Sequence, residues 1–368
     1  MGSGMDEVTR DGMSGLAGPV DALRMVPRMT GAMRAALGEQ WEIASKVAPT
    51  VVVAHPKALG GAHIAERLGV PFVASLPLPF LTPTAAFPIP FVAARLPARV
   101  NRLSYQFNRF TAVAYGGMIN TFRTRTLGLR RVSRVSDYLH DADGRPFPVL
   151  YPFSRHVVPV PPDYPASAHV TGYWFRPAGD DPWTPSPEMA SFLAGGGPVV
   201  YAGFGSMGFG RGAAARGKIL LEALRLSGVR AVVARGWGGI SLESSPGVLA
   251  LTEVPHSWLF PRVAAVIHHG GSGTTAAGLR AGRPTLICPV LGDQPFWGNR
   301  VHALGAGPAP LALSRMTPGR LAERITELVT NQTFARNAAF IGERIRAEDG
   351  TGEAVRALQR IAENAPEL

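Results

Sequence analysis

The chain has 368 residues, of which 46% are hydrophobic and 17% charged, and this length and apolar content favour two domains with separate cores. A single cysteine excludes a disulfide framework and a cysteine-based metal site. With neither an apolar run long enough to span a membrane nor a basic-then-apolar leader, we expect a cytoplasmic protein. The net charge is +11, and only three of the 37 basic residues are lysine. GC-rich coding DNA is the simpler explanation of the arginine excess, and a basic surface that attracts an anionic donor or membrane is the alternative.

Three short strands are predicted in the first half of the chain. Runs at residues 49–54, 71–75 and 148–151 have the composition of buried strands, whereas the residues before them show only weak helical periodicity. Residues 97–128, which are rich in arginine, could form an amphipathic helix on a membrane surface or a helix that lies on its own domain. Residues 159–187 contain eight prolines and are predicted to link two domains.

The second half alternates strands with helices over short connections, which is typical of a parallel sheet with helices on both faces. Ligands bind at the carboxyl ends of strands in such sheets, and the glycine-rich turns fall there.

We expect a first domain at residues 1–175, a second at 176–345, and a C-terminal helix at 346–368 that could pack back on the first. The predicted strands are residues 198–204, 229–234, 248–251, 263–268 and 284–289, and the predicted helices are 217–226, 274–281, 319–329, 333–348 and 353–363.

The string HHGGSGTT at residues 268–275 follows a predicted strand and opens a predicted helix. Glycines let the backbone approach a ligand, and a helix N-terminus offers unpaired N–H groups, so the string suits a diphosphate without a metal ion. His269 could donate a hydrogen bond to a phosphate oxygen, or offset its charge if protonated. A tight turn with a helix cap is the alternative, since one glycine-rich loop is a weak signal. The candidate diphosphate ligands are His269, Gly271, Ser272, Gly273 and Thr274.

Three further turns could add to the same site. In GDQPFW, residues 292–297, Asp293 can accept hydrogen bonds from sugar hydroxyls and Gln294 can both accept and donate them, although an Asx-type turn also explains the pair. Ser206, in YAGFGSM at the end of a predicted strand, could touch a phosphate or cap a helix. Trp237, in RGWGG after the next strand, could stack on a base or pack under its loop.

Together these turns resemble those of the bacterial and fungal sterol glucosyltransferases, within the larger UDP-glycosyltransferase family. The resemblance rests on four blocks in the same order and spacing, and a weaker likeness reaches back to about residue 50. The blocks are VPHSWLFPR at 254–262, AVIHHGGSGTTAAGLRAGRP at 265–284, GDQPFWG at 292–298 and GAGP at 305–308.

The resemblance implies the GT-B fold, an α/β class with two facing Rossmann-like parallel-sheet domains, of which the second holds a nucleotide sugar. It implies an inverting hexose transfer without a metal ion or cofactor, in which a base deprotonates an acceptor hydroxyl. The implied partners are a UDP-sugar and an apolar acceptor. We expect no nucleic-acid partner, and a monomer or homodimer. By resemblance, the diphosphate lies on the 268–275 loop, the hexose on Asp293 and Gln294, the base beside Val254 and His256, and the acceptor against Phe80, Thr82 and Phe87.

The sequence departs from the family at the catalytic base. The family carries this base on a glycine-rich loop, roughly Gly-Ser-Arg-Gly-Asp, after the first strand of the first domain, and nothing similar precedes residue 49. We therefore expect the first domain to lack its first two or three strands. A start codon assigned too late, a truncation, or another residue acting as base would each explain this. His55 and His63 are the candidates for the last case.

The sequence thus favours a glycosyltransferase that moves a hexose, with UDP-glucose as the expected donor, to a hydroxyl of a sterol, lipid or polyketide. A nucleotide-sugar-binding protein without turnover is the second hypothesis, because the donor half is complete and the acceptor half is not. An epimerase of the same fold is disfavoured, since those enzymes bring carboxylates into the site in another pattern.

Overall fold

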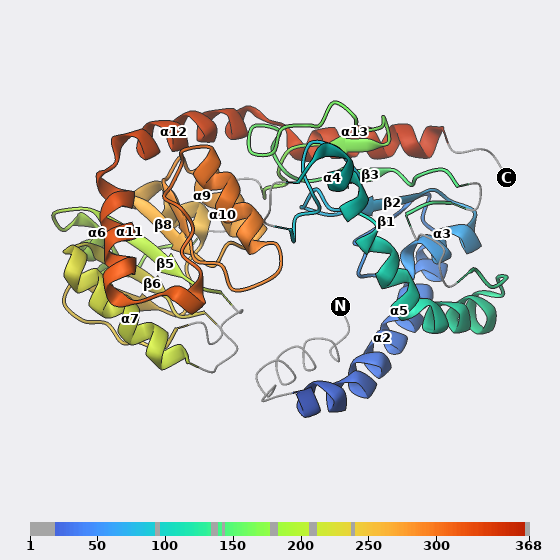
Figure 1. The fold of residues 1–368 in the computed structure, drawn as a ribbon, viewed down its shortest axis with the longest axis horizontal. Helices are drawn as coiled ribbons and strands as arrows, with labels where there is room; N and C mark the ends of the chain where they lie inside the picture. Colours follow the sequence, from blue (N-terminus) through green and yellow to red (C-terminus); the bar gives the residue numbers. More distant parts are fainter. Residues whose placement is uncertain are drawn as a thin grey trace. The chain divides into compact units, whose positions relative to one another are not determined.

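The computed structural model describes residues 19–92, 96–133, 139–141, 144–176, 183–205, 212–236 and 240–364, with the backbone alone at 19–29 and 110–112. The chain divides into two units, each with a parallel sheet and helices labelled in Figure 1. Unit 1 comprises Met1–Pro152, Val160–Thr171 and Gly350–Leu368, and unit 2 comprises Phe153–Pro159 and Gly172–Asp349.

Unit 1 is built on four parallel strands in the order β1-β2-β3-β4. Val73 and Leu150 point to one face of this sheet, where Ala354 and Ala357 of α13 pack against them. The last helix of the chain therefore completes the core that the first strands begin. The strands are β1 (Val52–Ala54), β2 (Phe72–Ser75), β3 (Val149–Tyr151) and β4 (Ala168–Val170).

The other face of this sheet is covered by helices from the first half of the chain. Leu37, Ile64 and Phe122 form a buried cluster that joins α2, α3 and α5. α5 continues into a π-helical turn, Arg123–Leu127, which ends at Gly128 because its φ of 67° is one that glycine adopts without strain. The helices of unit 1 are α2 (Pro19–Val47), α3 (Gly61–Leu68), α4 (Ala98–Ser104), α5 (Phe107–Phe122) and α13 (Gly350–Glu363).

Unit 2 contains five parallel strands in the order β7-β6-β5-β8-β9. The central strands β5 and β8 are buried along their whole length, as expected for a parallel sheet that is covered on both faces. The strands are β5 (Val199–Gly203), β6 (Arg230–Ala234), β7 (Val248–Leu251), β8 (Ala265–His268) and β9 (Thr285–Ile287). The α-helices are α6 (Pro187–Ala194), α7 (Ala213–Ser227), α8 (His256–Leu259), α9 (Ser272–Arg280), α10 (Gln294–Ala303), α11 (Pro318–Thr330) and α12 (Gln332–Ala347).

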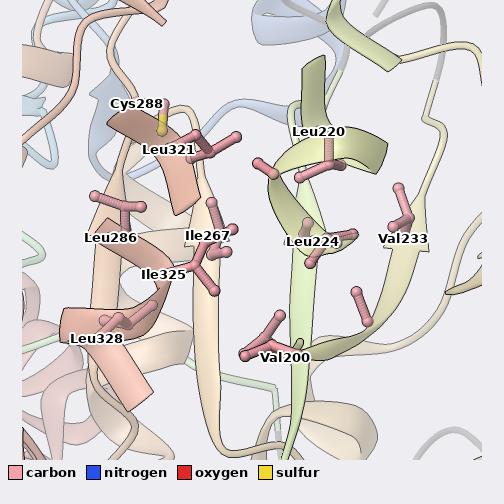
Figure 2. Close-up of a cluster of buried hydrophobic side chains, with 14 of the residues drawn as sticks. Val200, Leu220, Leu224, Val233, Ile267, Leu286, Cys288, Leu321, Ile325 and Leu328 are labelled. Carbon is pink, nitrogen blue, oxygen red and sulfur yellow. The ribbon is translucent and has the colours of Figure 1, made fainter. Parts of the chain in front are cut away.

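The largest core of unit 2 lies between its sheet and the helices α7 and α11. Leu220 and Leu224 of α7 point toward the strands that carry Val200 and Val233, while Leu321 and Ile325 of α11 pack nearer to β8 and β9 (Figure 2). Apolar residues three and four apart on each helix produce this single buried stripe. The core holds the strand ends in place, and the candidate site is built on those ends.

Two expectations for unit 1 need correction. The proline-rich residues 159–187, predicted as a linker, include β4, whose N–H and carbonyl groups pair with β3 and so offset the poor strand propensity of its surroundings. The single helix predicted across residues 97–128 is two helices, α4 and α5, which meet at Tyr105. None of the described helices combines the length and apolarity needed to cross a membrane.

Leu220→Ala is predicted to lower the free energy of unfolding of unit 2 by about 2–5 kcal/mol, because it leaves a cavity in the α7–sheet core. Leu226→Ala on the same helix is the matched control; Leu226 is 51% exposed, so a change within about 0.5 kcal/mol is expected. Urea unfolding followed by tryptophan fluorescence measures both, since five of the six tryptophans fall in unit 2. Equal losses in the two variants would contradict this account of the core.

Candidate functional site

The carboxyl ends of β5 and β8 mark the place in unit 2 where the strand order reverses. From β5 the chain moves outward to β6 and β7, whereas from β8 it moves to β9 at the other edge, so the two connections diverge. Gly203 of β5 is the register partner of His268 on β8, and a side chain on Gly205 would come within 3.0 Å of the His269 ring. In open parallel sheets, ligands bind in the crevice at such a reversal.

His268 shapes the loop that leaves β8. Its side chain is fully buried, and its Nδ1 accepts a hydrogen bond of 3.0 Å from the N–H of Gly270, whose φ of 99° requires glycine. An accepting Nδ1 leaves the proton of the ring on Nε2, and burial lowers the pKa of His268 well below its usual value. His268 is therefore neutral and fixes the turn.

The helix α9 begins at this turn. Gly271 precedes its first residue, and the N–H groups of the first turn have no acceptor within the helix. The buried Thr275 hydroxyl donates to the Gly271 carbonyl over 3.0 Å and so holds the turn closed. Gly273, in contrast, is exposed, and a side chain there would meet no atom within 4 Å. The N-terminus of α9 is therefore open to an anion at Gly273 and Thr274.

His269 lies over the start of α9, where a side chain on Gly271 would come within 2.7 Å of its Nε2. The ring is half-buried, and its Nδ1 has no hydrogen-bond partner among the described residues. Burial lowers the pKa of His269, and the carboxylate of Asp293 opposes this shift without cancelling it. The geometry thus favours a neutral His269 that donates a hydrogen bond over one that carries a charge.

Asp293 and Gln294 lie where the chain enters α10, but they have different partners. The indole N–H of the buried Trp297 donates to Oδ2 of Asp293 over 2.9 Å, which orients the carboxylate. Gln294 is 3% exposed, and its Oε1 accepts from the N–H groups of Val290 (2.7 Å) and Leu291 (3.2 Å). The prediction that Gln294 accepts hydrogen bonds from sugar hydroxyls is therefore wrong, because the loop backbone occupies its acceptor. Its amide N–H groups remain able to donate hydrogen bonds to sugar oxygens.

Two residues predicted to border a base, Val254 and His256, contact other side chains of unit 2. Val254 is 8% exposed and lies in a buried cluster with Tyr201, so its side chain belongs to the core, and the expectation that this segment borders a base stays a prediction. His256 stacks on Phe260 with ring centroids 4.4 Å apart, and its Nε2 lies 3.3 Å from the Tyr201 hydroxyl. Burial and the nearby His269 lower the pKa of His256 to about 4. His256 is thus a neutral member of an aromatic cluster beside the β8 loop.

Two predicted ligand contacts, Ser206 and Trp237, lie outside the described residues. The turns that lead to them are described: Gly205 follows β5 with a φ of 58°, and Gly236 follows β6 with a φ of 57°. A side chain on Gly236 would meet the Gly205 carbonyl at 2.9 Å, so the two turns touch. In the part of the chain that the structure describes, His, Cys, Asp and Glu side chains form no cluster that could hold a metal ion.

The segment after β2 holds the residues predicted to contact an acceptor. Thr82 is 7% exposed, with its N–H and hydroxyl 2.8 and 2.7 Å from the Tyr151 hydroxyl, so its polar groups are engaged within unit 1, and its contact with an acceptor stays a prediction. Phe80 is half-buried, and its ring meets that of Phe91 edge-on at 5.1 Å. Phe87 is also half-buried. The two phenylalanines keep some accessible apolar surface, whereas Thr82 supports the loop from inside.

An apolar cavity of unit 1 lies against the sheet face that α3 covers, and its walls include Leu59, Phe72, Ile119 and His63. Nδ1 of His63 accepts a hydrogen bond of 2.9 Å from Arg123, which also donates to Glu66 over 2.8 Å. Burial, with Arg123 beside it, lowers the pKa of His63 to about 4. The lone pair of the neutral ring is engaged, so His63 does not act as a base in this conformation.

His55 follows β1 at the carboxyl end of the strand and is exposed. Its Nδ1 accepts a hydrogen bond of 3.0 Å from the N–H of Lys57. Since an accepting Nδ1 puts the proton of the neutral ring on Nε2, no lone pair is free to take a proton from an acceptor. The geometry therefore argues against His55 as the catalytic base.

Trp297 is the residue of this site that reasoning from sequence missed. It stands four residues after Asp293, and on a helix this spacing places two side chains side by side. The contact between Trp297 and Asp293 could therefore have been predicted from the GDQPFW motif. The contacts of Gln294 with the loop between β9 and α10 could not be predicted from the sequence, because they depend on how that loop folds back.

Comparisons with known proteins give the chain's relatives. Residues 239–361 match the family of the erythromycin biosynthesis protein CIII-like C-terminal domain. A sterol 3-beta-glucosyltransferase of Arabidopsis thaliana is 36% identical over 327 residues, which cover 86% of this chain and 50% of that protein. A sterol 3-beta-glucosyltransferase of Yarrowia lipolytica is 34% identical over 348 residues, or 90% of this chain and 23% of that protein. The chain thus spans half the length of these relatives or less.

Solved structures show the same fold. The glycosyltransferase of kitacinnamycin matches with a TM-score of 0.68 and 18% identity, over 94% of this chain and 84% of that one. The glycosyltransferase VinC in complex with dTDP matches with a TM-score of 0.59 and 20% identity, over 91% and 76%. At such identities the likeness shows the fold alone, and it confirms the predicted α/β class with two parallel-sheet domains of the GT-B type.

Asp293→Asn is predicted to lower the pKa of His269 further, because it removes the carboxylate that opposes the effect of burial while Asn keeps an acceptor for Trp297. Titration of the histidine ring signals by NMR measures this pKa. Glu222→Gln is the control, since it removes a negative charge from an exposed pair with Arg225 in the same unit. A pKa of His269 that moves equally in both variants, or in neither, would show that Asp293 is not its electrostatic partner.

Proposed function

We propose that this chain is a UDP-glycosyltransferase, that unit 2 binds a UDP-sugar, and that the protein transfers the hexose to a hydroxyl of an apolar acceptor; the family match over residues 239–361 and the similarity to sterol glucosyltransferases support this. One observation carries the proposal: at the reversal between β5 and β8, the open N-terminus of α9 and the unpartnered nitrogen of His269 lie at the same edge of the sheet. A diphosphate offers oxygen acceptors to both groups.

We propose that the diphosphate is bound by groups that are neutral before the ligand arrives. The first-turn N–H groups at Gly273 and Thr274 donate to its oxygens, and His269 adds one hydrogen bond from its ring. As the sugar bond breaks, negative charge grows on the leaving diphosphate, and donors fixed in position stabilise that charge without first reorienting. The binding of dTDP by VinC, a structural neighbour, is consistent with a nucleoside diphosphate in such a fold.

The hexose is proposed to lie against Asp293. Its carboxylate accepts hydrogen bonds from sugar hydroxyls, and the indole of Trp297 keeps it in one orientation. Gln294 contributes through its amide N–H groups alone. Glucose is the proposed sugar because the relatives in Arabidopsis and Yarrowia are named as glucosyltransferases.

The transfer itself is proposed to invert the sugar carbon. An acceptor hydroxyl loses its proton to a base, its oxygen attacks the anomeric carbon, and UDP leaves with the electron pair of the broken bond. The names of the relatives make a sterol the first acceptor to test, and the accessible parts of Phe80 and Phe87 are compatible with an apolar molecule. We assign the base to neither His55 nor His63.

Nucleotide-sugar binding without turnover is the second candidate function. The engaged lone pairs of His55 and His63 favour it, since Nδ1 of each ring already accepts a hydrogen bond from another group of the protein. Release of UDP from UDP-glucose in the presence of a sterol distinguishes the two. Sterol-dependent release supports the transferase, and UDP binding without any release supports the second candidate.

Gly273→Val is predicted to weaken UDP binding at least tenfold, which corresponds to about 1.4 kcal/mol. A Cβ at this position meets no atom of the described residues within 4 Å, so we expect the variant to fold, while its side chain occupies the space in front of the first turn of α9. Gly319→Val is a matched control, because Gly319 is also the second residue of its helix, α11, and is equally open. Isothermal titration with UDP gives both affinities, and an unchanged affinity for Gly273→Val would remove the diphosphate from this turn.

Asp293→Asn is predicted to weaken UDP-glucose binding about tenfold while the affinity for UDP stays unchanged. The substitution removes the charged acceptor for sugar hydroxyls, whereas His269 is neutral before and after it. Titrations with both ligands test the assignment. A parallel loss for UDP and UDP-glucose would mean that Asp293 acts on the diphosphate and not on the hexose.

A further inference from the structure

The positive charge of this chain is concentrated in one segment. Residues 67–136 contain ten arginines, no lysine and no aspartate or glutamate, so this segment accounts for all but one of the eleven net positive charges. The rest of the chain is almost neutral. A bias of the coding DNA toward arginine would act along the whole sequence and would not remove every acidic residue from one segment. The asymmetry therefore needs a local explanation.

The same segment exposes an unusual number of large apolar side chains. The apolar surface of α4 and α5, as we name it, consists of Phe91, Val92, Val100, Leu103 and Phe107, which are 49%, 36%, 42%, 63% and 49% exposed. The rings of Phe91 and Phe107 lie 6.2 Å apart, and Phe80 contacts both, so this end of the surface is one continuous patch. Water contact with such a patch is unfavourable unless a partner covers it.

Arginines accompany this apolar surface. Arg99 and Arg102 lie on α4 beside Val100 and Leu103, and Arg109 follows Phe107 on α5. All three are exposed; Arg102 pairs with Asp163 at 3.3 Å, whereas no ion pair engages Arg99 or Arg109 in the described parts of the chain. Long arginine side chains can extend from an apolar surface to anionic groups at its border.

We infer that the apolar surface of α4 and α5, together with Arg99 and Arg109, docks unit 1 on a membrane that contains anionic lipid. Phenylalanine, leucine and valine enter the boundary between headgroups and acyl chains, while the arginines bind lipid phosphates and carboxylates. A nucleic acid would use the charge but would leave Leu103 and Val100 in water, so the combination favours a lipid surface. The inference goes beyond sugar transfer, because binding needs neither donor nor acceptor.

The test is sedimentation of the full chain with vesicles. Binding is expected to a two-to-one mixture of phosphatidylcholine and phosphatidylserine, to be weak with phosphatidylcholine alone, and to fall as salt rises. Leu103→Ser is predicted to weaken partitioning about tenfold through the loss of one buried apolar side chain. Arg99→Gln with Arg109→Gln is predicted to weaken it about tenfold on the mixed vesicles and to change little on phosphatidylcholine.

Matched controls come from unit 2. Leu226→Ser replaces a leucine that is 51% exposed on α7, and Arg315→Gln with Arg320→Gln removes two exposed arginines, so both should bind like the unchanged chain. Thermal unfolding checks that Leu103→Ser is folded. Equal binding to both vesicle types, no binding, or an unaffected Leu103→Ser would each overturn the inference. So would tighter binding to duplex DNA than to the mixed vesicles at the same salt concentration.

Discussion

Unit 2 of this protein depends on one topological constraint: the chain enters the five-stranded sheet at its middle strand, β5, and extends the sheet outward in both directions. Because the strands are buried on both faces, a ligand can reach the sheet only at the strand ends. The reversal keeps the connections from β5 and β8 from crossing there, so Gly205, His269 and the N-terminus of α9 meet at an open edge. Every role that we propose for unit 2 follows from that opening.

The chemistry at this edge relies on neutral groups. Burial lowers the pKa values of His256, His268 and His269, and the residues that we assign to the diphosphate include no lysine or arginine. Attraction to an anion comes instead from the helix dipole and from N–H groups that already point outward. The net charge of the chain is placed elsewhere, in residues 67–136. The proposed ligand site and the excess of positive charge thus lie in different units.

Local patterns predicted most of the fold but only part of the site. Apolar runs identified the strands of unit 2 because both faces of that sheet are buried, and the glycine-rich strings identified the turns. β4 was missed because its pairing with β3, rather than its own residues, makes it a strand. Gln294, Val254 and Thr82 were assigned to ligands, yet their side chains contact a neighbouring loop, a buried core and a tyrosine of the protein itself. Tyr151 is 69 residues from Thr82, and the contacts of Gln294 depend on how its own loop folds back, so a motif shows neither. The engaged lone pairs of His55 and His63 are also invisible in sequence.

The packing of α13 on Val73 and Leu150 has a consequence for the order of folding during synthesis. A chain that emerges from the ribosome N-terminus first usually folds its first domain first. Here the sheet of unit 1 stays open on one face until residues 354–357 have been made, whereas nearly all of unit 2 precedes them. Unit 2 can therefore be complete while unit 1 still waits for its last helix. Loss of the last helix, Gly350–Glu363, would then affect the part of the protein that was translated earliest.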